Sequence, residues 1–311
     1  LVGHVLARAS RDGHTLMPAD EVGHDLQLYR VADPAAAIRD ALAGEEVRAA
    51  AGPDGEQLLA LERYYLAEQA IADSIHRLAA AAEPIGTVRA KGSRAQGSRA
   101  KGNPSQGSQS VPDDGLDAVQ RSAVLNALGH GVSVLTGGPG TGKSRTVAAV
   151  VRAAELAGRS VALTAPTGRA AKRLAELCDA EAMTIHRLLG AQPRTTGDSG
   201  EVDFSAGFAR GPDWPLDEDV VVVDEASMLD VELAASLLRA CADSTHLMIV
   251  GDSAQLPSIG PGQVLADVIA AGKVPVVQLQ TLYRQDAGGA IARLATAVRG
   301  GELPVVDSPD R

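Results

Sequence analysis

A glycine-rich loop ending in a lysine and a serine is the segment of this chain best suited to chemistry. Residues 137–144 read GGPGTGKS, which fits the pattern G-x-x-x-x-G-K-[ST] and follows the apolar run VSVLT. Glycines let successive backbone N–H groups turn toward one anion, and the next helix N-terminus adds a favourable dipole. The pattern predicts that Lys143 reaches the β- and γ-phosphates of ATP and that Ser144 binds Mg²⁺. The predicted ATP contacts are Gly138, Pro139, Gly140, Thr141, Gly142, Lys143, Ser144 and Arg145.

A pair of carboxylates supplies the metal ligand and the base that this chemistry needs. Asp224 and Glu225 follow an apolar run, VVVV, at the C-terminal end of an expected strand, where open α/β sheets place their ligands. Asp224 is expected to hold Mg²⁺ and Glu225 to polarise the attacking water as general base. Acids are common at strand ends, so it is the combination with the glycine-rich loop that makes this pair significant.

Five short apolar runs, each followed by a helical stretch, form the scaffold expected around these residues. They are residues 132–136, 160–164, 220–224, 247–250 and 276–279. Continuous apolar strands separated by helices indicate a parallel sheet that is covered on both faces. The predicted fold class of this part is therefore α/β.

The rest of the chain divides by composition. Residues 1–83 are alanine-rich and amphipathic, which predicts a small, mainly helical domain. Residues 84–114 contain RAKGS, RAQGS and RAKGN and almost nothing apolar, so we expect a flexible basic linker. The α/β part is expected to cover 115–290, and 291–311 to begin a truncated further domain. Residues 191–217 interrupt the strand pattern, and an exposed excursion is expected there.

The amino-acid composition limits the classes of protein to which this chain can belong. The net charge is −10, with 45% hydrophobic and 22% charged residues, which is ordinary for a soluble globular chain. Nucleic-acid binders are usually basic, so any DNA contact must be local. Cys178 and Cys241 have neither a zinc-site nor a disulfide-framework spacing, and two reduced thiols are expected. No apolar run approaches the ~18 residues of a membrane span, so a cytoplasmic location is expected.

Several motifs around the loop and the acids resemble those of superfamily 1 helicases. The segment GDSAQLP at 251–257 is similar to their motif III, which implies that Gln255 senses the γ-phosphate. The segment LYRQ at 282–285 resembles motif IV, so Arg284 is expected to place a cation on the γ-phosphate as charge develops. Gln120 stands where the family's Q motif contacts adenine. The resulting catalytic set is Lys143, Glu225, Gln255 and Arg284.

Two further segments resemble the motifs with which that family touches single-stranded DNA. The segment APTGRAAKRL at 165–174 is similar to motif Ia, and TIHRLL at 184–189 to the next DNA-contact motif. A histidine such as His186 more often has a structural role, and the TIH context favours the DNA-facing one. The implied DNA contacts are Pro166, Thr167, Arg169, Lys172, Thr184 and His186.

The amino-acid sequences of these motifs, together with the helical segment that precedes them, resemble those of the RecD and TraA branch of the superfamily. The resemblance implies a P-loop, RecA-like motor domain, the first of two. It also implies 5′ to 3′ movement on single-stranded DNA, unwinding at duplex ends or forks in recombination and repair, and nuclease-helicase partner subunits. Motifs V and VI have no counterpart before Arg311. We therefore expect both ends of the chain to be cut and the chain alone not to unwind DNA.

Other readings of the same residues remain open. A ring-forming AAA-type remodelling ATPase shares the loop and the acids, but it should lack the GDSAQLP and TIH segments. DNA-stimulated hydrolysis by a monomer would separate the two classes. A DNA-binding fragment with an inactive nucleotide site disagrees with the intact lysine, serine and acids. The motor could also belong to a conjugative relaxase, whose histidine cluster would lie upstream of Leu1.

Overall fold

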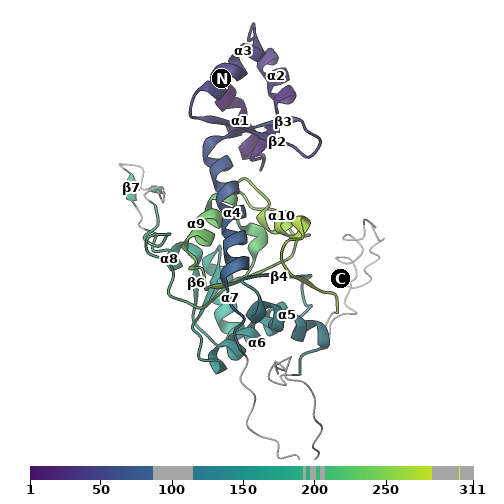
Figure 1. Cartoon of the computed structure of the whole chain (residues 1–311), viewed down its shortest axis with the longest axis vertical. Helices are drawn as coiled ribbons and strands as arrows, with labels where there is room; N and C mark the ends of the chain where they lie inside the picture. The colour runs from purple at the N-terminus through teal and green to yellow at the C-terminus, as the bar shows by residue number, and fades with distance from the viewer. Residues whose placement is uncertain (87–114, 192–193, 197–200, 204–206, 282–300, 302–311) are drawn as a thin grey trace, which may run out of the picture.

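The computed structural model describes residues 1–86, 115–191, 207–281 and 301, and the backbone of 194–196 and 201–203. Figure 1 shows an N-terminal unit joined by one long helix, α4, to a larger unit that contains the central sheet. Within the described residues, no helix is long and apolar enough to cross a membrane.

The N-terminal unit packs three helices against a small antiparallel sheet. Its elements are α1 (Val2–Arg11), β1 (Leu16–Pro18), α2 (Ala19–Leu28), α3 (Pro34–Ala43), β2 (Val47–Ala51) and β3 (Gln57–Leu61). The strand order is β1-β3-β2, with both pairings antiparallel. The unit is mainly helical as predicted, but the β2–β3 hairpin was not foreseen. Its strands are rich in alanine and leucine, which favour helix, so the turn residues Gly52-Pro53-Asp54-Gly55 were the better signal.

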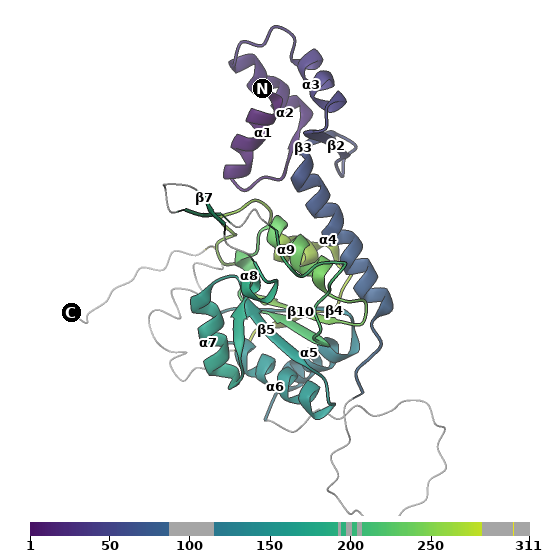
Figure 2. The ribbon, with the colours of Figure 1, turned by 90° about the vertical axis from the view of Figure 1, so that its left-hand side faces the viewer.

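Helix α4 (Glu62–Ala81) joins the two units and packs mainly on the larger one. Its buried residues Tyr64, Ala67, Ile71 and Leu78 belong to the same core as the helices and strands of the larger unit. Figure 2 shows α4 lying along α9 (Val231–Ala240) on one side of the sheet. The expected domain boundary at residue 83 therefore falls after a helix that already contributes to the core of the second unit.

The larger unit is built on six parallel strands in the order β11-β4-β10-β9-β5-β6. The strands are β4 (Val132–Gly137), β5 (Val161–Ala165), β6 (Ala182–Thr184), β9 (Val220–Val223), β10 (His246–Gly251) and β11 (Val276–Leu279). Five of them coincide with the predicted apolar runs, and the α/β prediction is confirmed. The missed strand, β6, has only three residues and no apolar run.

Helices cover both faces of this sheet, which explains why its strands are mainly apolar. Along β9, Val221 and Val223 face α4, α9 and α10 (Val264–Ala271), while Val220 and Val222 face the opposite layer. That layer consists of α5 (Ala118–Gly129), α6 (Lys143–Leu156) and α7 (Gly168–Cys178). Each residue of β9 thus meets a core on one side or the other. Cys178 and Cys241 are buried and unpaired, in agreement with two separate thiols.

Residues 191–217 form no strand of the six-stranded sheet among the residues described, as expected. They contain the two-stranded β7 (Arg194–Thr196) and β8 (Glu201–Asp203), and a bridge between Ala191 and Phe208 closes the segment. Trp214 is exposed, with the Arg210 guanidinium 4.2 Å from its ring centre. Cation–π pairs of this kind need a flat, accessible aromatic face. The third aromatic residue of this segment, Phe204, lies outside the described residues.

Candidate active site

The glycine-rich loop joins the end of β4 to the start of α6. Gly142 begins α6 with a φ of 90°, in the left-handed region that favours glycine. At Gly137, a Cβ atom would lie 2.7 Å from the carbonyl oxygen of Leu279 on β11, so a larger residue would displace the neighbouring strand. The pattern of glycines is therefore imposed by backbone geometry at both ends of the loop.

The amine of Lys143 lies over this loop. Its Nζ donates to the carbonyl oxygens of Gly137, at 2.6 Å, and Gly138, at 3.2 Å. The Thr141 hydroxyl donates to the Gly138 carbonyl at 2.8 Å, which closes the loop from within. An ammonium bonds more strongly to phosphate oxygens than to neutral carbonyls, because those bonds join opposite charges. The lysine is thus held at the position where a phosphate chain would meet the loop.

A cavity of about 500 Å³ opens above the loop, within the size range of small-ligand sites. It brings together residues from the ends of β4, β9 and β10 and from one side of α7. Because β10 lies between β4 and β9, the segment that follows it emerges between the glycine-rich loop and the acids. The lining residues are Gly138, Pro139, Gly140, Gly142, Lys143, Ser144, Arg145, Ala170, Arg173, Leu177, Asp224, Glu225 and Gln255.

The two acids at the end of β9 occupy a tightly fixed turn. The backbone N–H of Asp224 donates to Thr164 at 2.9 Å, and its side chain accepts from the N–H of Glu225, also at 2.9 Å. Glu225 has a φ of 53°, in the left-handed region that a residue with a Cβ rarely adopts. Such strain persists only where surrounding contacts enforce it, and it is common at functional sites. Asp230, five residues further on, caps α9, and its side chain accepts from the backbone N–H of Leu233 at 2.8 Å.

Burial is the main influence on the Asp224 carboxyl. It raises the pKa of Asp224 above the ordinary value, and the negative charge of Glu225 adds to this. The nearby charges of Lys143 and Arg173 lower the pKa and only partly offset the effect. A divalent cation at this carboxylate would favour the ionised form, because it adds positive charge where the protein supplies too little. The donor set of lysine amine, loop amides, serine hydroxyl and buried carboxylate fits a metal-bound phosphate chain.

Helix α7 contributes residues that the sequence did not assign to this cavity. Ala170, Arg173 and Leu177 recur at helical spacing and line the cavity. The sequence did contain a signal for this grouping. Arg173 and Leu177 follow Ala170 by three and seven residues, so all three side chains lie on one face of the helix. Arg173 therefore joins Lys143 and Arg145 as a third cationic side chain that lines the cavity.

The predicted DNA contacts lie at the same edge of the sheet, after β5 and β6. These strands are neighbours, with Ala165 opposite Thr184, so Pro166 and Thr167 lie near the TIH segment. Arg169 and Lys172 are exposed and do not line the cavity. The predicted DNA residues and the predicted ATP residues therefore occupy adjoining parts of one edge.

Both threonines of the predicted DNA contacts cap helices. The Thr167 hydroxyl accepts from Ala170 N–H at the start of α7, and the Thr184 hydroxyl accepts from Arg187 N–H at the start of α8 (Ile185–Leu188), each at 3.2 Å. The His186 ring lies 5.8 Å from that of Phe208, centre to centre. These contacts give Thr167, Thr184 and His186 structural roles beside the DNA-facing ones expected.

The predicted adenine contact lies apart from the cavity lining. Gln120 is 1% exposed, its backbone N–H is bound by Asp117, and its side-chain oxygen accepts from the N–H of Asp117. Its Nε2 has no hydrogen-bond partner among the described residues, an arrangement that is costly in a protein interior. Arg145 donates to the carbonyl of Gly115, which ties the start of this segment to the glycine-rich loop. Arg284 lies outside the described residues.

Residues 115–309 match the model of the AAA domain family, which is more than half of the 311 residues. The chain therefore belongs to the AAA domain family. The match includes every element of the cavity, from the segment before the glycine-rich loop to the end of the described sheet.

Curated relatives place the chain beside RecD proteins, which confirms the expected resemblance. It is 40% identical over 190 residues to the ATP-dependent RecD2 DNA helicase of Deinococcus radiodurans, covering 61% of this chain and 25% of that protein. It is 36% identical over 280 residues to the RecBCD enzyme subunit RecD of Mycobacterium tuberculosis, covering 79% and 42%. The RecD subunit of Mycolicibacterium smegmatis is 38% identical over 275 residues, covering 79% and 43%. The chain thus spans less than half of each relative.

Proposed function

We propose that this chain is the nucleotide-hydrolysing part of an ATP-dependent DNA helicase. The observation that carries the proposal is the cavity that gathers the glycine-rich loop, the Asp224–Glu225 pair and Gln255 beside the exposed cations of α7. ATP with Mg²⁺ is the proposed ligand, and single-stranded DNA is the polymer along which the protein is proposed to move. The similarity to RecD proteins supports the same activity for the protein to which the chain belongs.

Each residue of the cavity receives a role from its position. Lys143 balances charge on the β- and γ-phosphates, while Ser144 and Asp224 hold Mg²⁺. Glu225 takes the proton of the attacking water, and Gln255 contacts the γ-phosphate from between the loop and the acids. Arg284 is proposed to stabilise charge on the departing γ-phosphoryl group, and Gln120 to contact adenine with its unpartnered amide.

The DNA contact is proposed to be local and directed at the phosphate backbone. Arg169 and Lys172 supply positive charge, and the segments at Pro166–Thr167 and Thr184–His186 supply neighbouring polar contacts. The net charge of −10 agrees with a small contact surface and not with a broadly basic one. Binding should therefore weaken with salt and show little preference for sequence.

Unwinding is proposed for the whole protein only. Motor proteins of this kind close two domains around each nucleotide, so catalytic charges come from both sides. This chain supplies one side. Movement from 5′ to 3′, a role in recombination and repair, partner nuclease subunits and a cytoplasmic location remain proposals that rest on the RecD resemblance. The similarity to RecD proteins favours the helicase, and no feature of the described residues favours a remodelling ATPase or a relaxase setting.

A strand-displacement assay on a 5′-tailed duplex tests this proposal. The full-length protein should unwind the duplex with ATP, and the 311-residue chain should not. Glu225→Gln in the full-length protein should keep ATP binding and lose turnover, because an amide cannot accept the proton of the water. Glu232→Gln, on the first turn of α9 outside the cavity, is the matched control. Unwinding by full-length Glu225→Gln at the parental rate would overturn the assignment.

A further inference from the structure

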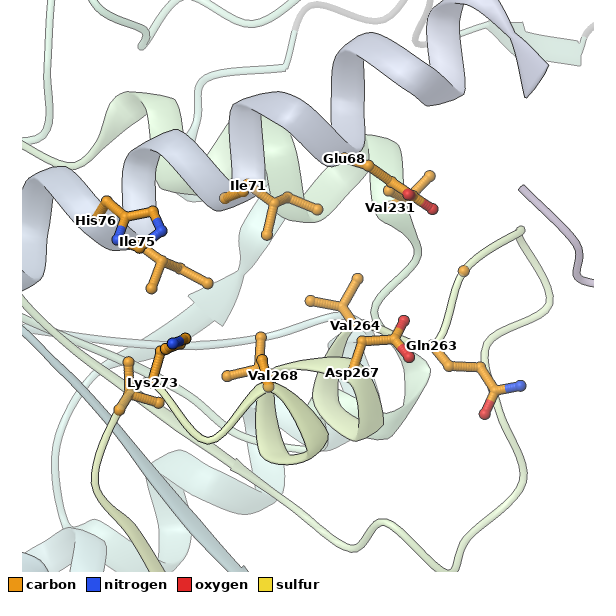
Figure 3. Close-up of a pocket in the computed structure, with 14 residues that line it drawn as sticks. Glu68, Ile71, Ile75, His76, Val231, Gln263, Val264, Asp267, Val268 and Lys273 are labelled. Atoms are coloured by element: carbon orange, nitrogen blue, oxygen red, sulfur yellow. The ribbon is translucent and has the colours of Figure 1, made fainter. Parts of the chain in front are cut away.

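A second cavity lies between α4 and α10, and no residue of it belongs to the nucleotide site. It has a volume of about 280 Å³ and is mainly apolar. Figure 3 shows side chains of both helices directed into the space between them. The apolar lining is formed by Ile71, Ile75, Val231, Val264, Val268 and Val274. We call this space the α4–α10 groove.

The two ends of the α4–α10 groove carry opposite charges. Glu68 and Asp267 lie at one end, while His76 and Lys273 lie at the other (Figure 3). Partial burial raises the pKa of both carboxyls, and for Glu68 the charge of Asp267 adds to the effect. Among the residues that the structure describes, neither carboxylate has an ion-pair partner. A cation at this end would stabilise both carboxylates.

Contacts between the two units hold the walls of the groove in place. The Thr15 hydroxyl of the N-terminal unit donates to the Glu68 carboxylate. The backbone N–H of Gly262 donates to the carbonyl of Gly13 at 3.0 Å, just before α10 begins. The groove is therefore a preformed feature of the joint between the units. Preformed sites bind with a smaller loss of conformational entropy than sites that must first become ordered.

The dimensions of the groove favour a few side chains over a whole small molecule. Its volume falls just below the roughly 300–1,000 Å³ of typical small-ligand pockets. Glu68 and His76 are eight residues apart on α4, which corresponds to about 12 Å along a helix. That length matches about two turns of a partner helix or about four residues of extended chain.

We propose that the α4–α10 groove binds a short segment of a partner protein that carries a basic residue, then apolar side chains, then an acidic residue. The basic residue meets Glu68 and Asp267, the apolar side chains fill the space lined by Ile71 and Val268, and the acidic residue meets Lys273. Complementary charges at both ends fix the direction in which the segment lies. This proposal is independent of ATP hydrolysis and of DNA binding.

Selection from a display library of random 12-residue peptides tests the proposal directly. The wild-type chain should enrich peptides with a basic residue, one or more large apolar residues and an acidic residue in fixed order. Glu68→Lys combined with Asp267→Lys should instead enrich an acidic residue at the first position. Asp73→Lys, on α4 outside the groove, is the matched control and should enrich the wild-type pattern.

A second variant tests the apolar part of the groove. Ala72→Trp should fill the space and weaken individual enriched peptides at least tenfold by fluorescence anisotropy, while Ala79→Trp on exposed α4 surface should not. Thermal unfolding establishes that each variant is folded, and if Ala72→Trp is not, the charge-reversal selection decides. The proposal is overturned if no charge order is enriched, if reversal leaves the order unchanged, or if folded Ala72→Trp binds within twofold of wild type.

Discussion

The proposed nucleotide part and the proposed DNA part of the sheet's C-terminal edge owe their geometry to different features. After β4 and β9, backbone conformation sets the geometry, since Gly142 and Glu225 both adopt left-handed φ values. After β5 and β6, threonine hydroxyls cap helices and the charged side chains are exposed. A site whose geometry is set by the backbone depends on single residues. On a surface of exposed charges, several side chains share the free energy of binding. The nucleotide part should therefore respond far more sharply to single substitutions.

Lys143→Ala should have the largest effect. Removing the charge beside the phosphates should lower ATP turnover of the full-length protein by at least about 100-fold, the scale for a lost catalytic donor. Steady-state phosphate release measures this, with Lys273→Ala, outside the nucleotide cavity, as the control. Turnover within twofold of the parent would show that the glycine-rich loop is not the hydrolytic site.

Helix α7 allows the comparison to be made within one element. Arg173→Ala should reduce ATP turnover because Arg173 lines the cavity, while Arg169→Ala with Lys172→Ala should mainly reduce affinity for single-stranded DNA. The DNA effect should be similar for all sequences and should shrink as salt rises. Parallel titrations of ATP hydrolysis and DNA binding measure both. If the two variants had the same profile, the assignment of Arg173 to the cavity and of Arg169 and Lys172 to the DNA contact would be wrong.

The threonine caps should have a smaller effect, on stability. Thr184→Ala should lower the free energy of unfolding by about 1 kcal/mol, within the range of lost N-caps. Thr184→Ser keeps a hydroxyl and should restore most of it, as measured by urea unfolding. DNA affinity that falls in Thr184→Ala but returns in Thr184→Ser would agree with a cap that positions the TIH segment. Unchanged stability in Thr184→Ala would contradict the capping role.

On stability, Asp224→Asn should have a small effect of opposite sign. The raised pKa of Asp224 means that its ionised form costs stability at neutral pH, and that this cost disappears as pH falls through the raised pKa toward the ordinary value. The variant without nucleotide should therefore unfold at a higher temperature than the parent at pH 7, as measured by thermal unfolding. The difference should vanish in acid, and ATP turnover should be lost. Equal midpoints at pH 7 would contradict the burial argument.

Sequence patterns predicted the parts of this molecule that depend on local physics. Continuous apolar runs identified five strands, because a sheet covered on both faces is built mostly from apolar residues. The glycine-rich loop and the acid pair were found because their chemistry restricts the residues allowed at each position. The β2–β3 hairpin was missed because its alanine and leucine residues favour helix and only tertiary pairing overrides this.

Features that depend on how separate segments pack were not predictable in the same way. Arg173 lines the same cavity as Asp224 because α7 packs on β5, the neighbour of β9 in the sheet, and these two residues are about 50 positions apart in the chain. The assignment of α4 to the core of the larger unit and the groove beside α10 have the same origin. Amphipathic spacing showed that α4 buries one face, but not which unit covers that face.

The most direct measurement is ATP hydrolysis by the full-length protein with and without single-stranded DNA. The nucleotide cavity and the exposed cations of α7 share one helix and one edge of the sheet, so DNA bound at Arg169 and Lys172 should affect the cavity. We predict that single-stranded DNA of any sequence stimulates hydrolysis, that stimulation falls as salt rises, and that Arg169→Ala with Lys172→Ala raises the DNA concentration needed. Hydrolysis that is the same with and without DNA would contradict the central claim that ATP hydrolysis at this site is coupled to DNA binding.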